Sequence, residues 1–389
     1  MALGTATVDT RAVTHNAGVL AAHGGGQLMA VVKADGFGHG AVPVARAALA
    51  GGAGWLGVAT CAEALALRAA GIAAPTLAWL VRPGEDCRAA VAAGVDLAAG
   101  TPDQLVAAAA AGRAVGREAA VHLKVDTGLA RNGAAPQDWP ELVRWAGKLA
   151  AEGGLRVRAV WSHLACADEP GHPSVPAQLT VFDEAVAHAR AAGLDPVRHL
   201  ANSAAALAVP AARYDLVRAG IGLYGVEPVR GRRFGLRPAL TLTAPVVSVR
   251  RVPAGTPVSY GHQYVTRRAT TLALVGLGYA DGVPRAAGPC ARVWLAGARH
   301  PVAGAVTMDS LVLDVGDAPV AVGDEAVLWG AGRWGEPTAA DWAGWAGTNP
   351  HEILTGLGAR TARRYLPTGF GDHLPAGGGH HLTAGGGGD

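Results

Sequence analysis

Lys33 is the residue of this sequence whose position most clearly suggests covalent chemistry. It follows directly on the apolar run Leu28–Val32 and precedes the segment Gly36-Phe37-Gly38-His39-Gly40. Most lysines are ordinary solvated surface residues, but active sites of barrel proteins form at the carboxyl ends of their strands. An amine at such a place, with its pKa lowered by removal from water, could attack a carbonyl group and form a Schiff base.

The segment Gly220-Ile221-Gly222-Leu223-Tyr224-Gly225 has the spacing GxGxxG and follows a candidate strand. A dinucleotide site would require a helix next and an acidic residue about 20 positions later. Glu227-Pro228 follows instead, and residues 238–250 contain no acidic residue, so we exclude a nicotinamide dinucleotide. Close-packed glycine amides could still hold a phosphate, together with Asn202-Ser203. A glycine-rich turn between domains is an equally good interpretation.

His163 and Arg218 each end a further apolar run. A histidine at a strand end is more often a structural hydrogen-bonding residue, and an arginine is more often part of a surface ion pair. In a barrel, however, these two residues would lie at the same rim as Lys33 and Asn202-Ser203. Independent surface residues have no reason to fall at strand ends, so this convergence indicates a site.

The elements that must position these residues alternate regularly between residue 8 and about residue 225. The expected strands are Leu28–Val32, Trp55–Ala59, Thr76–Val81, Ala120–Val125, Val157–Trp161 and Asp215–Val217, with Val95–Ala98 and Arg198–Leu200 as weaker candidates. The expected helices include Ala41–Ala50, Ala62–Ala70, Gln104–Ala111 and Ala177–Ala191, and Thr101-Pro102-Asp103 is a favourable helix start. This alternation predicts an α/β fold with a parallel sheet. The length favours an N-terminal (β/α)8 barrel, although the pattern alone also permits a doubly wound sheet.

The pattern changes near Pro238, where short strand candidates separated by Gly, Pro and Asp replace the helical segments. These are Ala239–Arg251, Thr270–Leu277, Ala291–Leu295, Ser310–Val315 and Glu325–Leu328, followed by one expected helix at Ala339–Trp345. We therefore predict a barrel domain over residues 1–237 and a C-terminal, mostly β domain over residues 238–367. Residues 368–389 are a glycine-rich, low-complexity tail that we expect to be disordered.

Composition narrows the functional class. The 33 basic and 30 acidic residues give a net charge of only +3 and form no basic stripe, so nucleic acid is not an expected partner. Cys61, Cys87, Cys166 and Cys290 form no CxxC pair, which argues against zinc or any other metal site. No signal peptide and no apolar run of about 20 residues is apparent, so we expect a cytoplasmic protein without a membrane partner.

Taken together, these motifs resemble the bacterial alanine racemases, enzymes of fold-type III that depend on pyridoxal 5'-phosphate, and in particular the actinobacterial members. The resemblance covers about residues 5–366. It is carried by the following segments, which occur in the family's order: Val31–Gly40, Lys124–Arg131, Ser162-His163, Asn202-Ser203, Val217–Ile221, Gly278–Gly282 and Met308-Asp309. The resemblance implies a barrel followed by a β domain, in a head-to-tail homodimer whose active site is shared across the interface.

The resemblance also implies a role for each candidate residue. Lys33 would hold the cofactor and act as one catalytic base, and Tyr279 of the partner chain would be the second base. Arg218 would face the pyridine nitrogen, with His163 as its hydrogen-bond partner. The phosphate would lie near Asn202, Ser203, Gly220 and Ile221. Arg131 and the backbone at Met308 would hold the substrate carboxylate, and Lys124 matches a lysine that is often carbamylated.

The chemistry of racemisation explains this arrangement. An α-proton must leave one face of the substrate and return to the other, so two bases must flank one planar centre. The cofactor supplies the electron sink and the protein supplies orientation. Because an arginine does not readily give up its proton, Arg218 would leave the pyridine nitrogen unprotonated and weaken that sink. The resemblance thus implies interconversion of L- and D-alanine, which supplies D-alanine for peptidoglycan.

Three positions depart from the family pattern. Phe37 and His351 stand where a tyrosine near the phosphate is usual, and Thr307 stands where a cysteine is frequent. Loss of two phenol donors should weaken the hold on the cofactor without touching a proton-transfer residue. Three alternatives are a racemase for another amino acid in a specialised pathway, a homologue that binds the cofactor with little turnover, and a decarboxylase of the same barrel class.

Overall fold

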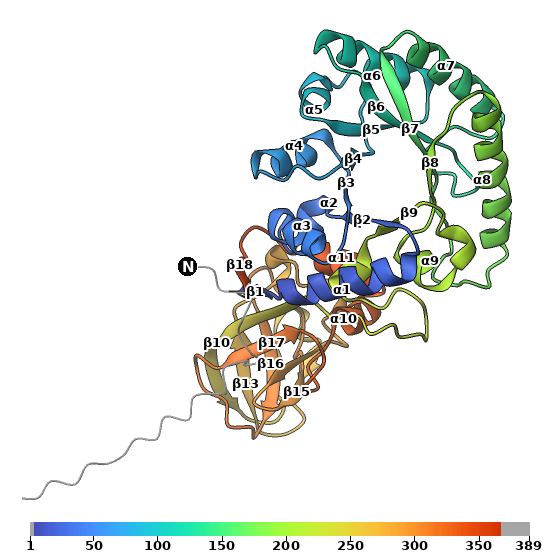
Figure 1. The fold of residues 1–389 in the computed structure, drawn as a ribbon. Coiled ribbons are helices and arrows are strands. Elements are labelled where there is room, and N and C mark those ends of the chain that lie inside the picture. The colour runs from blue at the N-terminus through green and yellow to red at the C-terminus, as the bar shows by residue number, and fades with distance from the viewer. Residues whose placement is uncertain (1–3, 367–389) are drawn as a thin grey trace, which may run out of the picture. The chain divides into compact units, whose positions relative to one another are not determined.

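The computed structural model describes residues 4–366, and the predicted tail 368–389 lies outside the described residues. The chain divides into two compact units (Figure 1). One contains Asp9–Ala239, and the other contains residues 4–8 together with residues 240–366. The predicted domain of residues 1–237 therefore differs from the first unit at its start, because the N-terminal strand belongs to the other unit.

The unit of residues 9–239 is built on eight parallel strands in the order β8-β7-β6-β5-β4-β3-β2-β9. They are β2 (Gln27–Val31), β3 (Trp55–Val58), β4 (Thr76–Ala78), β5 (Val95–Ala99), β6 (Ala119–Lys124), β7 (Leu155–Trp161), β8 (Val197–His199) and β9 (Leu216–Ala219). All eight expected strands are present, and the predicted (β/α)8 barrel is confirmed.

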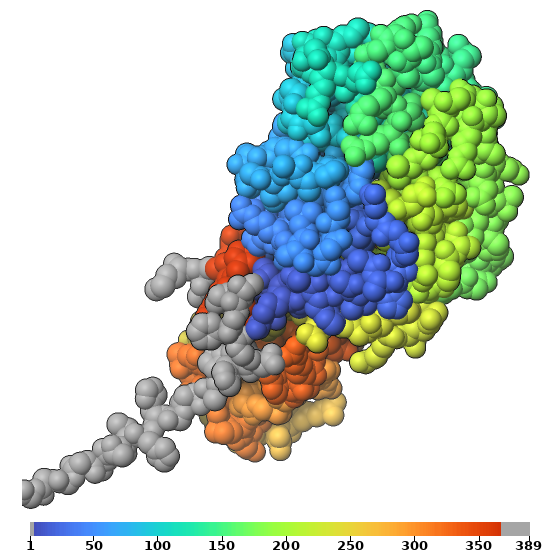
Figure 2. Space-filling model, viewed as in Figure 1, coloured from blue at the N-terminus to red at the C-terminus, as the bar shows by residue number. Residues whose placement is uncertain are grey.

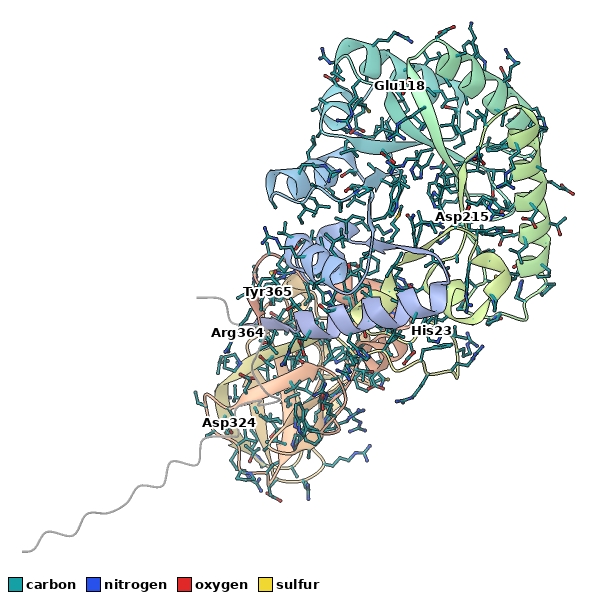
Figure 3. All side chains as sticks on the ribbon, in the orientation of Figure 1. His23, Glu118, Asp215, Asp324, Arg364 and Tyr365 are labelled. Carbon is teal, nitrogen blue, oxygen red and sulfur yellow. The ribbon has the colours of Figure 1, made fainter. Side chains whose placement is uncertain are left out.

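The first and last strands of that order meet and complete the barrel. The Asp215 amide donates to the Arg198 carbonyl (3.1 Å), and the Arg218 amide donates to the Ala201 carbonyl (2.9 Å). The Arg198 guanidinium also donates to both carboxylate oxygens of Asp215 (2.8 and 2.9 Å), the residue that leads into β9 (Figure 3). These bonds bring the two ends of the strand order together.

Helices alternate with these strands and form much of the unit's outer surface (Figure 2). They are α1 (Thr10–Gly24), α3 (Ala41–Ala50), α4 (Cys61–Ala69), α5 (Arg88–Ala92), α6 (Pro102–Ala114), α7 (Trp139–Ala151), α8 (Ser174–Ala191) and the short α9 (Ser203–Ala208). The expected start of α6 is confirmed, because the Thr101 hydroxyl accepts from the Gln104 amide with Pro102 at the first helical position. Among residues 4–366, no helix is long and apolar enough to cross a membrane.

The segment between β2 and α3 has an unusual backbone. It contains α2 (Lys33–Phe37), in which Ala34, Asp35, Gly36 and Phe37 all have φ between 51 and 60°. The left-handed conformation costs roughly 1–2 kcal/mol for each residue other than glycine. Such a turn persists only where its surroundings hold it.

The second unit is mostly β, as predicted, and its centre is the long strand β10 (Leu240–Val252). This strand pairs with β13 (Thr270–Val275) and β17 (Glu325–Trp329), and also with β1 (Thr5–Val8). The sheet is completed by β14 (Arg292–Leu295), β15 (Ala298–Pro301), β16 (Leu311–Gly316) and β18 (Ala362–Tyr365), which pairs in parallel with β1. The smaller elements are the pair β11 (Pro257–Val258) and β12 (Tyr264–Val265), and the helices α10 (Ala339–Ala346) and α11 (Pro350–Thr355).

Candidate active site

Lys33 opens α2, one residue beyond the end of β2, and its side-chain nitrogen lies 5.9 Å from the centroid of the Trp79 ring. Burial lowers the pKa of Lys33, and the positive charge of Arg131 lowers it further, whereas Glu63 raises it. A lowered pKa increases the fraction of neutral, nucleophilic amine near pH 7. The structure therefore places a partly buried lysine with a lowered pKa just beyond the carboxyl end of a barrel strand.

Other basic residues from the sequence analysis gather at the same end of the barrel. Lys124 is the last residue of β6, and its ammonium lies 4.5 Å from the centroid of the Trp161 ring. Its pKa falls to about 8 because of burial and then the charges of Arg131 and Arg218. His163, just beyond β7, has its pKa lowered by burial and by the charges of those three residues and Lys33. The cluster favours a ligand that carries negative charge.

Arg218, on β9, is buried at the base of this cluster. It donates to the carbonyls of Ser162 (2.7 Å), His199 (2.9 Å) and Leu200 (3.0 Å). It also contacts Nδ1 of His163 (3.1 Å) and Nδ1 of His199 (3.0 Å). Because a guanidinium only donates, both imidazole Nδ1 atoms must accept. Burial lowers the pKa of Arg218 to about 9, which still leaves it mostly protonated at neutral pH.

A chain of buried polar residues continues from Arg218 into the barrel interior, and the sequence analysis missed it. Nε2 of His199 lies 2.9 Å from Nδ1 of His122, and Nε2 of His122 lies 3.0 Å from the Asp96 carboxylate. Arg158 donates to the same carboxylate (3.1 Å). Since Nδ1 of His199 accepts from Arg218, each imidazole donates through Nε2, and every hydrogen bond points towards Asp96. The sequence could have revealed these residues, because each is a titratable residue within an apolar strand, as in Val95-Asp96-Leu97 and Val121-His122-Leu123.

The glycine-rich segment lies close to Ser203 at the start of α9. The Ser203 hydroxyl oxygen accepts from the amides of Gly220 (2.8 Å) and Gly222 (3.2 Å), and Ile221 opens the short helix η2 (Ile221–Tyr224). Asn202 caps α9 by accepting from the Ala205 amide (3.0 Å). This segment follows β9 and Ser203 follows β8, so these backbone groups come from the last two strands of the barrel. Barrels often bind phosphate after their last strands.

Phe37 lies close to Gly220. Its ring stacks on that of Tyr224, with centroids 4.5 Å apart, and the Tyr224 hydroxyl donates to the Val31 carbonyl (2.9 Å). A methyl group built on Gly220 would lie 3.5 Å from Cζ of Phe37, in ordinary van der Waals contact. The para position of this ring therefore faces the glycine-rich segment, where a tyrosine would carry its hydroxyl. The cationic cluster and this glycine cradle together fit a cofactor that bears a phosphate.

The remaining predicted residues belong to the second unit and are described only relative to one another. Tyr279 opens the short helix η4 (Tyr279–Asp281), and its side chain is 43% exposed. Its amide donates to the Thr307 carbonyl (3.0 Å), and the Ala280 amide donates to the Met308 carbonyl (3.0 Å). Met308 is 52% exposed. Tyr279 and Met308 are thus held on two paired loops with both side chains exposed.

Arg360 connects the same two loops. Its guanidinium lies 3.0 Å from the Asp281 carboxylate and 2.7 Å from the Asp309 carboxylate. The Thr307 hydroxyl is engaged with the Ser310 carbonyl (2.8 Å), and His351 lies on α11. Among residues 4–366, no group of three or more His, Cys, Asp or Glu side chains could hold a metal ion.

Comparison with known proteins identifies both units. Residues 8–228 match the family "alanine racemase, N-terminal domain", and residues 239–365 match "alanine racemase, C-terminal domain". The chain is 55% identical over 367 residues to the alanine racemase of Frankia casuarinae, which covers 93% of this chain and 96% of that protein.

Solved structures agree with this result. The chain is similar to the alanine racemase of the D-cycloserine-producing Streptomyces lavendulae, with a TM-score of 0.93 and 49% identity over 95% of this chain and 98% of the other. It is also similar to the alanine racemase of Bartonella henselae, which was solved with covalently bound pyridoxal phosphate. That match has a TM-score of 0.84 and 29% identity over 94% of this chain and 100% of the other.

Proposed function

We propose a two-base mechanism for this chain, which belongs to the alanine racemase family and interconverts L- and D-alanine. Lys33 and Tyr279 are the two bases of the proposal. The observation that carries it is the position of Lys33, whose amine has a lowered pKa and stands at the carboxyl end of β2 among several other cations. A neutral amine there can take a proton from one face of a bound amino acid.

Pyridoxal 5'-phosphate is the proposed cofactor, and when bound it supplies the electron sink for a carbanion at the substrate Cα. Lys33 would hold it covalently. Arg218 and His163 would contact its pyridine ring, and Asn202, Ser203, Gly220 and Ile221 would surround its phosphate. The glycine cradle beside Phe37 and the excess of cations at this rim support the assignment.

Arg218 sets the electronic character of this site. A guanidinium donates and does not accept, so the group facing it must present a lone pair. With a pKa of about 9, Arg218 remains mostly protonated at pH 7. A pyridine nitrogen opposite Arg218 would therefore stay unprotonated, which limits charge delocalisation and favours simple return of the proton over side reactions.

Arg131 and the backbone at Met308 would hold the substrate carboxylate, and Lys124 would orient Arg131 after carbamylation. Carbamylation requires a neutral amine, which adds to carbon dioxide and releases one proton. The Lys124 pKa of about 8 makes a useful fraction of that form available near neutral pH. The resulting anion would replace the repulsion between Lys124 and Arg131 by attraction.

Tyr279 belongs to the second unit and Lys33 to the first. We propose that the chain acts as a homodimer in which Tyr279 and Met308 of one chain reach the barrel mouth of the other. Their exposed side chains support this arrangement. We further propose that the protein is cytoplasmic and supplies D-alanine for peptidoglycan. We expect it to have no nucleic-acid or membrane partner.

The test is residue-specific labelling combined with an assay. Purified protein supplied with pyridoxal phosphate and L-alanine should form D-alanine, and borohydride should fix the cofactor to Lys33. The chain has two other lysines, Lys124 and Lys148, which act as internal controls in peptide mapping. A label on either of them would contradict the assignment of the cofactor to Lys33. Absence of D-alanine would contradict the proposed activity.

A further inference from the structure

Glu63, at the start of α4, connects the ends of two neighbouring barrel strands. One of its carboxylate oxygens accepts from the Ala34 amide (2.8 Å), immediately after Lys33. The other accepts from the amides of Ala59 (2.8 Å) and Thr60 (3.1 Å), just beyond β3. A capping box needs only the bond from the Thr60 amide to the Glu63 carboxylate and the bond from the Glu63 amide to the Thr60 hydroxyl. The bond to Ala34 goes beyond capping, because Ala34 belongs to another element.

The backbone that Glu63 reaches is the left-handed turn of α2. Its far end is held by the Asp35 carboxylate, which accepts from the Ala41 amide (2.9 Å), and by the Gly40 amide, which donates to the Asp35 carbonyl (2.8 Å). At the near end, the Gly36 amide donates to the Val32 carbonyl (2.9 Å). Glu63 is the carboxylate that holds the near end beside Lys33. Without it, an unfavourable backbone conformation loses a charge-assisted bond where the lysine is attached.

Glu63 also acts on the charge of Lys33. Burial and Arg131 both disfavour the ammonium form, and Glu63 is the group that favours it. The cations Lys124, Arg131 and Arg218 face this rim from β6, the loop after it and β9, while Asp126 is the acidic neighbour of Lys124. Removal of the Glu63 charge should therefore lower the pKa of the Lys33 amine.

We propose that Glu63 is a positioning residue for Lys33: its carboxylate holds the left-handed turn and thereby fixes where the amine stands. The proposal rests on the proposed function of Lys33 as the cofactor-binding base. Glu63 itself touches backbone amides of its neighbours, and it acts only through the turn and through its charge.

Two variants separate this role from simple capping. Glu63→Ala removes the charge and all three acceptor contacts, whereas Glu63→Gln keeps one acceptor oxygen without the charge. The matched control is Asp341 of α10, which forms a capping box with Thr338 (2.8 Å to the Thr338 amide) in the other unit. Asp341→Ala removes the same kind of cap far along the chain from Lys33.

The first measurement is amide hydrogen exchange over residues 33–40 in protein without added cofactor. Loss of one charge-assisted bond predicts about tenfold faster exchange in Glu63→Ala, a smaller increase in Glu63→Gln, and no change there in Asp341→Ala. The second is competitive acetylation of lysines against pH, with the exposed Lys148 as reference. The pKa of Lys33 should fall in both Glu63 variants and stay unchanged in the control.

Neither measurement depends on catalytic turnover. The two measurements therefore test the role of Glu63 separately from the proposed function of the chain. Wild-type exchange over residues 33–40 and a wild-type pKa for Lys33, in a Glu63→Ala protein whose Tm falls as in the control, would reduce Glu63 to a helix cap and overturn the proposal. Borohydride labelling at a lysine other than Lys33 would overturn the proposed function instead. If Glu63→Ala does not fold, the same two measurements on Glu63→Gln take its place. Unchanged amide exchange over residues 33–40 and an unchanged Lys33 pKa in Glu63→Gln would overturn the proposal.

Discussion

Burial and contact with Arg218 together set the protonation state of His163 and His199. Because Arg218 can only donate, His163 and His199 present their Nδ1 lone pairs to it. Burial and the charge of Arg218 lower the pKa of both imidazoles well below its usual value. Both histidines are therefore neutral across the physiological range, and the positive charge at the barrel mouth resides on the lysines and arginines. That charge therefore does not depend on the titration of these two histidines.

Phe37→Tyr is the residue-scale prediction for cofactor affinity. The hydroxyl would extend from Cζ towards Gly220, where the phosphate is proposed to lie. One added hydrogen bond to a charged group contributes roughly 1.5–3 kcal/mol, which corresponds to at least about tenfold tighter binding. The affinity for pyridoxal phosphate is measured by titrating the apoprotein of each variant with the cofactor. Phe234→Tyr is the matched control, because the Phe234 ring contacts His23 (centroids 6.0 Å apart) and is not among the atoms nearest to Gly220. Equal or weaker affinity in Phe37→Tyr would mean that the phosphate is satisfied by other groups, such as His351 or water.

At the scale of elements, the loops that carry Tyr279 and Met308 fit together without spare space. A Cβ built on Gly278 would come within 2.3 Å of the carbonyl oxygens of both Thr307 and Met308. Gly278 has φ −138° and ψ −163°, which any residue can adopt. Glycine is therefore required at position 278 because any Cβ would collide with the backbone of the second loop.

Gly278→Ala should accordingly destabilise the protein by about 1–3 kcal/mol, as overpacking against an immobile backbone does, and should displace Tyr279. The expected result is a lower midpoint of chemical unfolding and a kcat reduced more than cofactor affinity. Gly344→Ala is the control, because nothing lies within 4 Å of its added Cβ on helix α10. There, higher helix propensity should raise stability by about 1 kcal/mol. Equal behaviour of the two variants would show that the loops are not closely paired.

At the scale of the whole molecule, the proposed homodimer makes a prediction about mixed subunits. Lys33→Ala and Tyr279→Phe homodimers should each be nearly inactive. In a mixed dimer of the two variants, one site carries both lesions and the other combines an intact Lys33 with an intact Tyr279. Random exchange should therefore restore roughly a quarter of all sites. Activity is measured before and after exchange, and mass spectrometry of the intact dimers verifies the exchange. No recovery would mean that both bases come from one chain.

Much of the first unit follows from local sequence signals. Each of the eight barrel strands was expected within a few residues of its observed bounds, because apolar runs and alanine-rich segments alternate and Thr101-Pro102 marks a helix start. The place of Lys33 just beyond the end of β2 is likewise determined by local sequence. The ordered motifs identified the family, and the family matches agree with that identification.

Only the tertiary structure decided features that depend on partners distant in the sequence. Strand β1 joins the second unit because its four residues pair with β10 and β18, more than 200 residues away, and a four-residue segment carries no signal of its partner. Asp96, His122 and His199 stand 26 and 77 residues apart, and their chain to Arg218 exists because closure of the barrel brings their strands together. Glu63 reaches Ala34 across 29 residues for the same reason. Local patterns determine which elements form, whereas hydrogen bonds between elements depend on how those elements close around one core.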